Sequence, residues 1–175
     1  MKKLVLRFTD DKIRYWSGEY NYYQSKIEQE ILDLVPTVKK RGYIFKNEFI
    51  LVSRWKSPRT FKHYSSNDAE YIKEITTLAL STKNEQLRIE SLTLLSGINY
   101  PAASVILHFF HKDKYPIIDF RALWSIKSGV PKKYSFPFWF DYVQFCRKLS
   151  SISGCNMRIV DQALWAYSKV NQKST

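Results

Sequence analysis

Helical periodicity with only brief interruptions is the feature of this sequence that most constrains its fold. Apolar residues recur at three- and four-residue spacing in one segment after another, and the 175-residue chain contains only five glycines and six prolines. We find no low-complexity stretch and no visible repeat. A chain of this length can bury a core without a metal or a disulfide. The pattern predicts an all-α protein, as one domain or as two small lobes.

Capping residues and apolar stripes predict eight helices. They cover residues 25–40 (with a kink at Pro36), 47–54, a segment capped by Ser66 or Asn67 and ending at Leu80, the segment after Asn84, and residues 101–111, 120–127, 137–149 and 158–169. One short strand is predicted as well, LVLRF at residues 4–8, without a pairing partner.

The charge balance favours a polyanionic partner. Lys and Arg number 28 against 16 acidic residues, a formal net charge of +12. No apolar run approaches the length of a membrane-spanning helix, so nucleic acid is a better partner than a membrane. The apolar stretch near the start is interrupted at Arg7 and Asp10, which makes it too short for a secretory signal. We expect a cytoplasmic, nucleoid-associated protein.

Only two cysteines are present, Cys146 and Cys155. Their spacing does not fit a paired metal-ligand motif, and two cysteines are too few for a four-cysteine iron–sulfur or zinc site. A disulfide between them stays open, although packed thiols are favoured in a reducing compartment.

The segment with the clearest functional signal is residues 84–121, NEQLRIESLTLLSGINYPAASVILHFFHKDKYPIIDFR. It consists of two amphipathic helices joined by the tight turn LSGIN and followed by an aspartate in an extended stretch. Gly97 can adopt a positive φ, and Asn99 is the non-glycine residue best able to do so. The backbone amides before Pro101 would then point outward, toward a phosphate at the N-terminus of the second helix.

LSGINYPAASVIL followed by YPIIDFR resembles the helix-hairpin-helix DNA glycosylase superfamily, which includes endonuclease III, the adenine glycosylases and the 3-methyladenine glycosylases. Gly97 matches the first glycine of the family turn, Ile98 its apolar residue and Asp119 the catalytic aspartate, whereas Asn99 departs from the second glycine. WSGEY from residue 16, RWKSPR at 54–59 and RIVDQALWAYSK at 158–169 extend the resemblance, toward a bacterial branch, over nearly the whole chain.

The resemblance implies a two-lobe fold with a central cleft. Residues 25–114 would form one lobe, containing the helix-hairpin-helix at 84–111, and residues 1–24 with 115–175 would form the other, carrying the catalytic aspartate. The partner would be double-stranded DNA with a damaged or modified base flipped into the cleft, and we expect a monomer.

The resemblance also implies that Asp119 acts in hydrolysis of the bond between base and sugar, where a carboxylate stabilises the positive charge that develops on the sugar. Pro101 stands where bifunctional members carry their Schiff-base lysine, which implies a monofunctional enzyme with water as nucleophile. Three alternatives stay open: Asp119 as a helix cap in a non-catalytic DNA-binding module, a lyase that uses Lys56 or Lys114, and a metal-dependent nuclease. No cofactor or iron–sulfur cluster is expected, and a monovalent cation at the hairpin stays open.

DNA-backbone contacts are expected at Gly97, Ile98, Asn99, Tyr100 and Arg121, although Arg121 could equally be solvated. A second set could line the base pocket or contact the strand. This set comprises Trp55, Lys56 and Arg59, with Arg54 beside them, and Trp55 taken alone is better explained as a core residue.

Several other polar residues are weaker candidates. His108 and His111, with Asp113 nearby, invite a metal site, but a capping or snorkelling role is commoner for histidines at a helix end. A second carboxylate could come from Glu85, Glu90 or Asp161, and their spacing singles none of them out. Trp124 and Trp165 fall in apolar stripes and are predicted to lie in the core.

Overall fold

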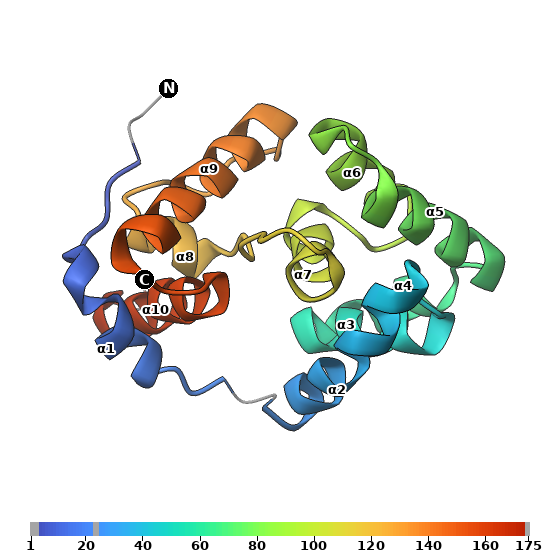
Figure 1. The fold of residues 1–175 in the computed structure, drawn as a ribbon, viewed down its shortest axis with the longest axis horizontal. Coiled ribbons are helices and arrows are strands. Elements are labelled where there is room, and N and C mark those ends of the chain that lie inside the picture. The colour runs from blue at the N-terminus through green and yellow to red at the C-terminus, as the bar shows by residue number, and fades with distance from the viewer. Residues whose placement is uncertain (1–3, 23–24, 174–175) are drawn as a thin grey trace. The chain divides into compact units, whose positions relative to one another are not determined.

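The structure is a computed structural model that describes residues 4–22 and 25–173. All regular secondary structure within those ranges is helical (Figure 1), which confirms the all-α prediction. The chain divides into two compact units. Residues 1–22 and 115–175 make up one, here called the terminal unit, and residues 23–114 make up the other, the central unit.

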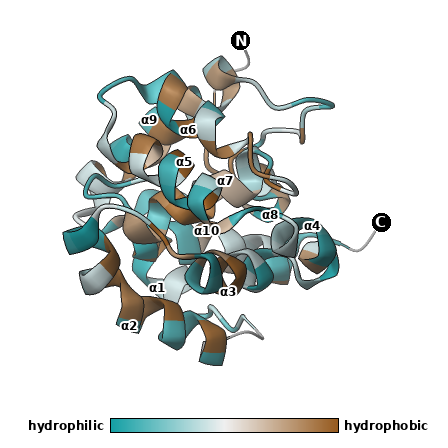
Figure 2. Ribbon diagram, turned by 90° about the vertical axis from the view of Figure 1, so that its right-hand side faces the viewer, coloured by the Kyte–Doolittle hydropathy of each residue, from teal (hydrophilic) through white to brown (hydrophobic). Residues whose placement is uncertain are grey.

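The central unit is organised around helix α7 (Tyr100–Phe110), whose residues 102–107 are all buried. Helices α2, α3 and α6 contact α7, and α5 packs on α6. The surrounding elements are α2 (Ser25–Arg41), α3 (Lys46–Lys56), η2 (Pro58–Thr60), α4 (Phe61–Ser65), α5 (Ala69–Ser81) and α6 (Glu85–Leu92). Figure 2 shows apolar and polar residues alternating along α2, which buries Ile31 and Val38 and exposes Lys39 and Lys40.

The terminal unit is organised around α10 (Met157–Asn171), which contacts α1 (Ile13–Gly18), α8 (Phe120–Ser125) and α9 (Phe136–Ser153). A short 3₁₀ turn, η1 (Asp10–Lys12), precedes α1 and packs near α9. Trp139 and Tyr142 of α9 are fully enclosed, together with Leu164 of α10. The core of this unit is therefore built from the N-terminal and the C-terminal parts of the chain.

Side-chain caps explain where several helices begin. Asn84 accepts a hydrogen bond from Leu87 N–H at the start of α6, and Asn156 does the same for Ile159 N–H at the start of α10. The start of α5 corrects the prediction, because Asp68 is its cap rather than Ser66 or Asn67. Asp68 accepts from two amides in the first turn, so its carboxylate satisfies donors that the helix itself leaves unpaired.

Two other predictions need correction. Residues 4–8 form no strand within the described chain; Val5 and Arg7 donate backbone hydrogen bonds to Ile126 and Ser125 at the end of α8 instead. Helices α1 and α4 were not predicted, because elements of five or six residues are too short to show an apolar period. Helix α9 runs four residues beyond its predicted end and stops at Gly154, which adopts a left-handed conformation.

Cys146 and Cys155 are both buried free thiols, so the disulfide that the sequence left open is not formed. Burial raises the pKa of the Cys146 thiol far above its ordinary value. No helix in the described ranges is both long enough and apolar enough to cross a lipid bilayer.

Candidate functional site

The turn between α6 and α7 needs glycine at residue 97 for two separate reasons. Gly97 has φ +84°, a region that other residues rarely adopt. A Cβ atom at this position would also lie 2.9 Å from the Cβ of His63 and from the ring of Tyr64. The expected positive φ at Asn99 is wrong: its φ is −113°, and its side chain caps α7 by accepting from Ala102 N–H. Within the turn only Gly97 has a positive φ, and Asn99 has the extended backbone of a helix N-cap.

Asn67 fixes this turn to the end of α4. Its amide nitrogen donates to the carbonyls of Ser96 (3.1 Å) and Tyr64 (3.0 Å), and its oxygen accepts from the N–H of Ser96 at 2.7 Å. Asn67 is buried, so these bonds are shielded from water. One side chain therefore bridges segments 29 residues apart in the sequence.

Two backbone amides of the turn remain available for an outside acceptor. Ile98 N–H donates to Leu95 within the turn, whereas the N–H groups of Gly97 and Asn99 donate no hydrogen bond to any described residue. Gly97 and Asn99 are exposed, and Asn99 is the first residue before the positive end of the α7 dipole. An anion at this position would be met by amide donors and by a favourable dipole.

Ile98 and Tyr100, the other two predicted residues of the hairpin, differ in exposure. The side chain of Ile98 is buried. Tyr100 is half-buried and donates from its hydroxyl to Glu90 at 3.0 Å. Burial, with this hydrogen bond, raises the pKa of Tyr100 well above its ordinary value. Any contact that Ile98 makes with DNA would therefore use its backbone, whereas the side chain of Tyr100 is only partly enclosed.

Asp119 follows a fully buried segment, residues 115–118, and is itself half-buried. It caps α8 and accepts from Arg121 N–H at 2.9 Å. The backbone just before it is held from both sides: Ile117 N–H donates to Asp161, and Ile117 C=O accepts from the hydroxyl of Tyr142. These bonds hold the main chain at a fixed place two residues before the carboxylate.

The negative charge of Asp119 acts on two tyrosines of the terminal unit, Tyr134 and Tyr142, and Arg121 is the residue whose N–H donates to this carboxylate. Burial raises the pKa of Tyr134, and the negative charge of Asp119 adds to this effect, so the two groups share an electrostatic environment. The guanidinium of Arg121 lies 5.0 Å from the ring centre of Phe120 and 5.5 Å from that of Trp165. Arg121 forms no ion pair with the described part of the chain, so its charge is available to an anion.

The pocket candidates near residue 55 differ in exposure. Trp55 is only 4 % exposed and packs edge-on against Phe109 at 5.4 Å, so it lies in the core of the central unit. Lys56 is half-buried at the end of α3, and Arg59 is exposed on η2. The two cations are therefore the members of this set that a ligand could reach.

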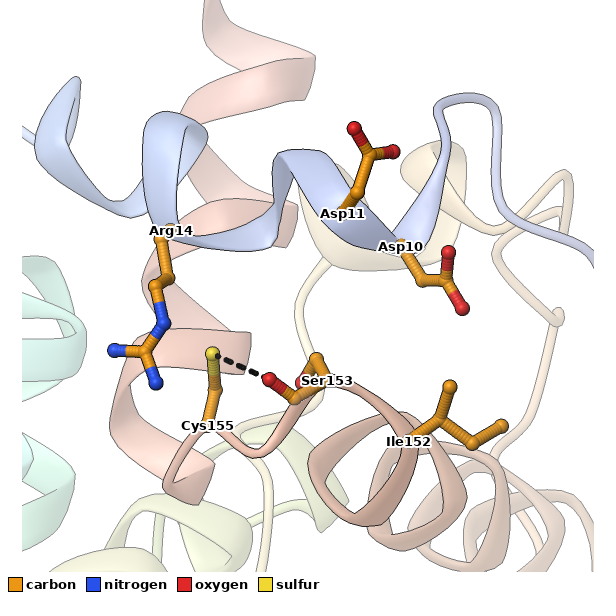
Figure 3. A pocket seen from close by; sticks show the side chains of 6 residues that line it. All are labelled: Asp10, Asp11, Arg14, Ile152, Ser153 and Cys155. Carbon is orange, nitrogen blue, oxygen red and sulfur yellow. Dashed lines mark hydrogen bonds between the residues drawn. The ribbon is translucent and has the colours of Figure 1, made fainter.

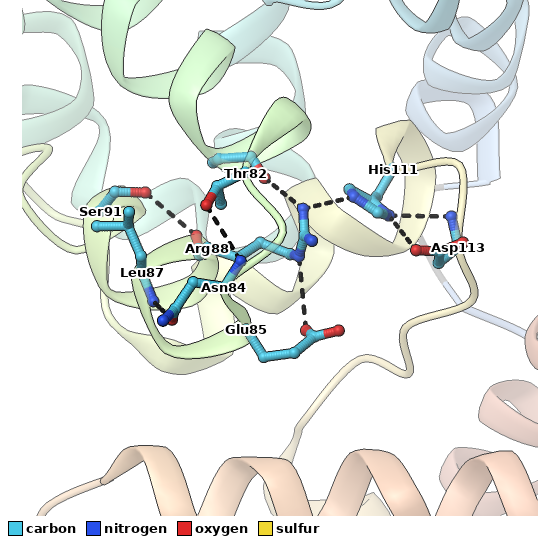
Figure 4. Close-up of polar contacts among 9 residues, drawn as sticks. Thr82, Asn84, Glu85, Leu87, Arg88, Ser91, His111 and Asp113 are labelled. Carbon is cyan, nitrogen blue, oxygen red and sulfur yellow. Dashed lines mark hydrogen bonds and ion pairs between the residues drawn. The ribbon is translucent and has the colours of Figure 1, made fainter.

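His111 is part of a buried polar cluster (Figure 4), and the described residues contain no group of three metal-ligating side chains. Its Nε2 atom is 2.6 Å from the guanidinium of Arg88, and its Nδ1 atom accepts from Asp113 N–H at 2.9 Å. Arg88 also donates to the carbonyl of Ala79 and pairs with Glu85. Burial, then the charge of Arg88, lowers the pKa of His111 to about 4. The cluster joins the ends of α5, α6 and α7.

The remaining weak candidates also have structural partners. His108 packs edge-on against Phe109. Glu90 accepts from Tyr100, and Asp161 accepts from Arg158 at 2.7 Å as well as from Ile117. These bonds give Glu90 and Asp161 positioning roles within their own units.

The core prediction for Trp124 and Trp165 is wrong, because both are half-buried. Arg7 lies over the ring of Trp124 at 4.3 Å, and Tyr20 and Tyr22 pack against Trp165. An apolar stripe on a helix does not distinguish a buried position from one that aromatic and basic side chains cover.

Sequence reasoning also missed a small cavity of about 250 Å³ in the terminal unit (Figure 3). It contains none of the predicted site residues. The lining residues are Asp10, Asp11, Arg14, Ile152, Ser153 and Cys155. Arg14 donates to the carbonyl of Gly154, which ties α1 to the end of α9.

Asn67, His63 and Tyr134 are the other residues that sequence reasoning missed. Asn67 and His63 lie about 30 residues before the turn that they contact, and no local pattern links them to it. Tyr134 follows the basic pair Lys132 and Lys133, which could have drawn attention to this loop.

Comparison of the chain with protein-family models, with curated proteins and with solved structures finds no match.

Proposed function

We propose that this protein is a monofunctional DNA glycosylase with a helix-hairpin-helix element formed by α6, the Gly97 turn and α7. The observation that carries the proposal is the setting of Asp119. It is a half-buried carboxylate at the start of α8, preceded by backbone that Asp161 and Tyr142 hold in place. Asp119 lies nine residues after the end of α7. The turn before α7 has two backbone N–H groups, those of Gly97 and Asn99, that donate to no described residue.

In the proposed reaction the bond between the base nitrogen and the sugar C1′ breaks, and the electron pair leaves with the base. The sugar then carries positive charge, which the ionised carboxylate of Asp119 stabilises. Water adds to C1′, and the proton that it loses is accepted by Asp119 or by solvent. The departing base takes up a proton, and the products are a free base and an abasic site.

DNA binding in this proposal relies on the turn and on cationic side chains. The amides of Gly97 and Asn99 would bind a phosphate at the N-terminal end of α7, and His63 lies exposed against the turn. The lobe of residues 25–114 would grip the backbone, and the lobe carrying Asp119 would act on the flipped base. A chromosomal substrate implies a cytoplasmic protein associated with the nucleoid.

The absence of an amine at Pro101 favours water over a lysine as nucleophile. Lys56 and Lys114 are the alternative lysines, and borohydride reduction during turnover distinguishes the two routes. A reduced covalent adduct with DNA would assign a lyase. Base release without any adduct supports the monofunctional reaction.

The experiment that tests the proposal is a screen of duplex oligonucleotides that each carry one altered base. The altered bases are alkylated, oxidised or deaminated, or are modified bases of the kind found in phage DNA. Wild-type protein and Asp119→Asn are compared for alkali-labile strand breaks. We expect wild type to release at least one base and the variant to release none. Binding of duplexes by wild type without release from any of them would instead indicate a DNA-binding module on a glycosylase-like scaffold.

A further inference from the structure

The terminal unit carries an aromatic cluster that the proposed reaction does not use. Tyr20 and Tyr22 each meet Trp165 edge-on, with ring centres 5.3 and 5.6 Å away, and the two tyrosine rings are stacked at 6.2 Å. All three residues are half-buried, so none of them is fully enclosed. Three aromatic rings from distant parts of the sequence thus form one partly exposed surface, here called the Trp165 cluster.

Cations surround this cluster. The guanidinium of Arg121 lies 5.5 Å from the centre of the Trp165 ring, and the ammonium of Lys169 lies 5.0 Å from it. Neither forms an ion pair with the residues described. Arg158 lies over Tyr20 and donates to its hydroxyl, but its charge is partly balanced by Asp161. The surface therefore combines exposed ring area with an excess of positive charge.

We propose that the Trp165 cluster is a platform for unpaired DNA bases, which stack on its rings while Arg121 and Lys169 contact the phosphates of the same strand. This inference rests on the proposed function, because it adds to it a preference for single-stranded or locally unpaired DNA. A ligand with alternating flat apolar groups and negative charges matches a surface of flat rings and cations.

The placement of Arg121 and Lys169 is consistent with this use. The contact of the Arg121 guanidinium with the Trp165 ring is weak, so an arriving phosphate can draw this cation away and leave the ring face to a base. Lys169 also donates to Asn21 at 2.7 Å, which links α10 to the segment that carries Tyr20 and Tyr22. Arg121 lies in the first turn of α8, two residues after Asp119, so the cluster and the proposed catalytic carboxylate share the start of one helix.

A second aromatic group in the terminal unit, which includes Trp124 of α8 and Tyr167 of α10, provides a matched control. Tyr167 packs against Phe8, Trp16 and Trp124, and lies two positions from Trp165, on a different side of the helix. Arg7 covers the Trp124 ring but is held in place by a hydrogen bond to the carbonyl of the same residue. Trp124 is thus a half-buried tryptophan with a cation whose position the protein already fixes.

The test measures, by fluorescence anisotropy, the binding of a fluorescently labelled oligothymidylate of ten nucleotides. We expect wild type to bind, Trp165→Leu and Tyr22→Leu to weaken binding by about fivefold or more, and Trp124→Leu to leave it unchanged. The double substitution Arg121→Gln with Lys169→Gln retains the rings. It is expected to reduce the slope of log affinity against log salt concentration by about 0.7 for each phosphate that the variant no longer neutralises. Circular dichroism checks that each variant is folded.

Equal binding by wild type, Tyr22→Leu and the double cation variant would overturn the inference, and so would equal weakening by Trp124→Leu. The result is distinguishable from a failure of the proposed function. If no altered base is released but oligothymidylate binds through the cluster, the glycosylase proposal fails and the platform stands. If a base is released and oligothymidylate does not bind, the platform fails and the glycosylase proposal stands.

Discussion

Two aspartates of the terminal unit have different environments and therefore different roles. Asp161 is only 6 % exposed, and its two oxygens accept from Ile117 N–H and from Arg158. Asp119 is half-buried at the start of α8, where one of its oxygens accepts from Arg121 N–H. A buried carboxylate with both oxygens engaged positions the chain, whereas a partly exposed one can meet a substrate. The proposed reaction assigns the chemistry to Asp119 and gives Asp161 a positioning role through Ile117.

At Gly97, conformation and close contact act together, and Gly42 allows the two effects to be separated. Gly42 has a similar φ of +83° but no neighbour within 4 Å of an added Cβ. We expect Gly42→Ala to lower the free energy of unfolding by about 1 kcal/mol through backbone strain alone. Gly97→Ala should lower it by about 3 kcal/mol, because the added methyl group also meets Tyr64 and His63. Urea unfolding measures both values, and equal losses would show that the contacts at Gly97 are unimportant.

His111 should make the stability of the protein depend on pH. Its pKa is lowered to about 4 in the folded protein, below the value near 6.5 of an unfolded chain, so the unfolded state binds a proton first as the pH falls. Folding is therefore destabilised progressively between pH 6.5 and pH 4, by up to about 3 kcal/mol. His111→Gln can still accept from Arg88 but does not titrate. Urea unfolding at pH 7 and pH 4.5 should show a larger loss for wild type than for the variant, and equal losses would contradict this assignment.

Helices with clear caps were predicted well, and elements that depend on distant contacts were not. Asn84 and Asp119 stand where the sequence predicted helix starts, and each accepts from an amide of the first turn. Local chemistry is enough to define such positions. The partners of Trp165 are Tyr20 and Tyr22, about 145 positions away in the chain. The helical periodicity around residue 165 does not predict contacts at that distance. The same reason explains why the turn around Gly97 was predicted but the residue that clamps it was not.

That clamp is testable at the level of the turn and the two helices that it joins. Asn67→Ala removes the hydrogen bonds to both backbone groups of Ser96 and leaves them without this partner. We expect a loss of about 2–3 kcal/mol in the free energy of unfolding. Ser66→Ala is the control, because Ser66 is exposed and bonds only to His63 in its own turn. A loss for Asn67→Ala no larger than that for Ser66→Ala would show that the turn does not depend on the clamp.

At the scale of the whole molecule, the net charge of +12 should dominate the encounter with DNA. Binding to a polyanion releases counterions, so affinity falls as salt rises. We expect duplex affinity to fall by about tenfold or more between 50 and 200 mM salt, as for roughly two or more neutralised phosphates. Fluorescence anisotropy at several salt concentrations measures the slope. A flat profile would refute the electrostatic part of the proposed binding mode.

The most direct test of the central claim is the single-turnover rate of base release by Asp119→Asn, measured on whichever substrate the wild-type protein cleaves. Asp68→Asn is the matched control, since Asp68 is also a helix-capping aspartate and asparagine caps about as well as aspartate. Catalysis by Asp119 predicts a fall of about 10²-fold or more for Asp119→Asn, with DNA affinity retained, and an unchanged rate for Asp68→Asn. Equal rates for the two variants would contradict it.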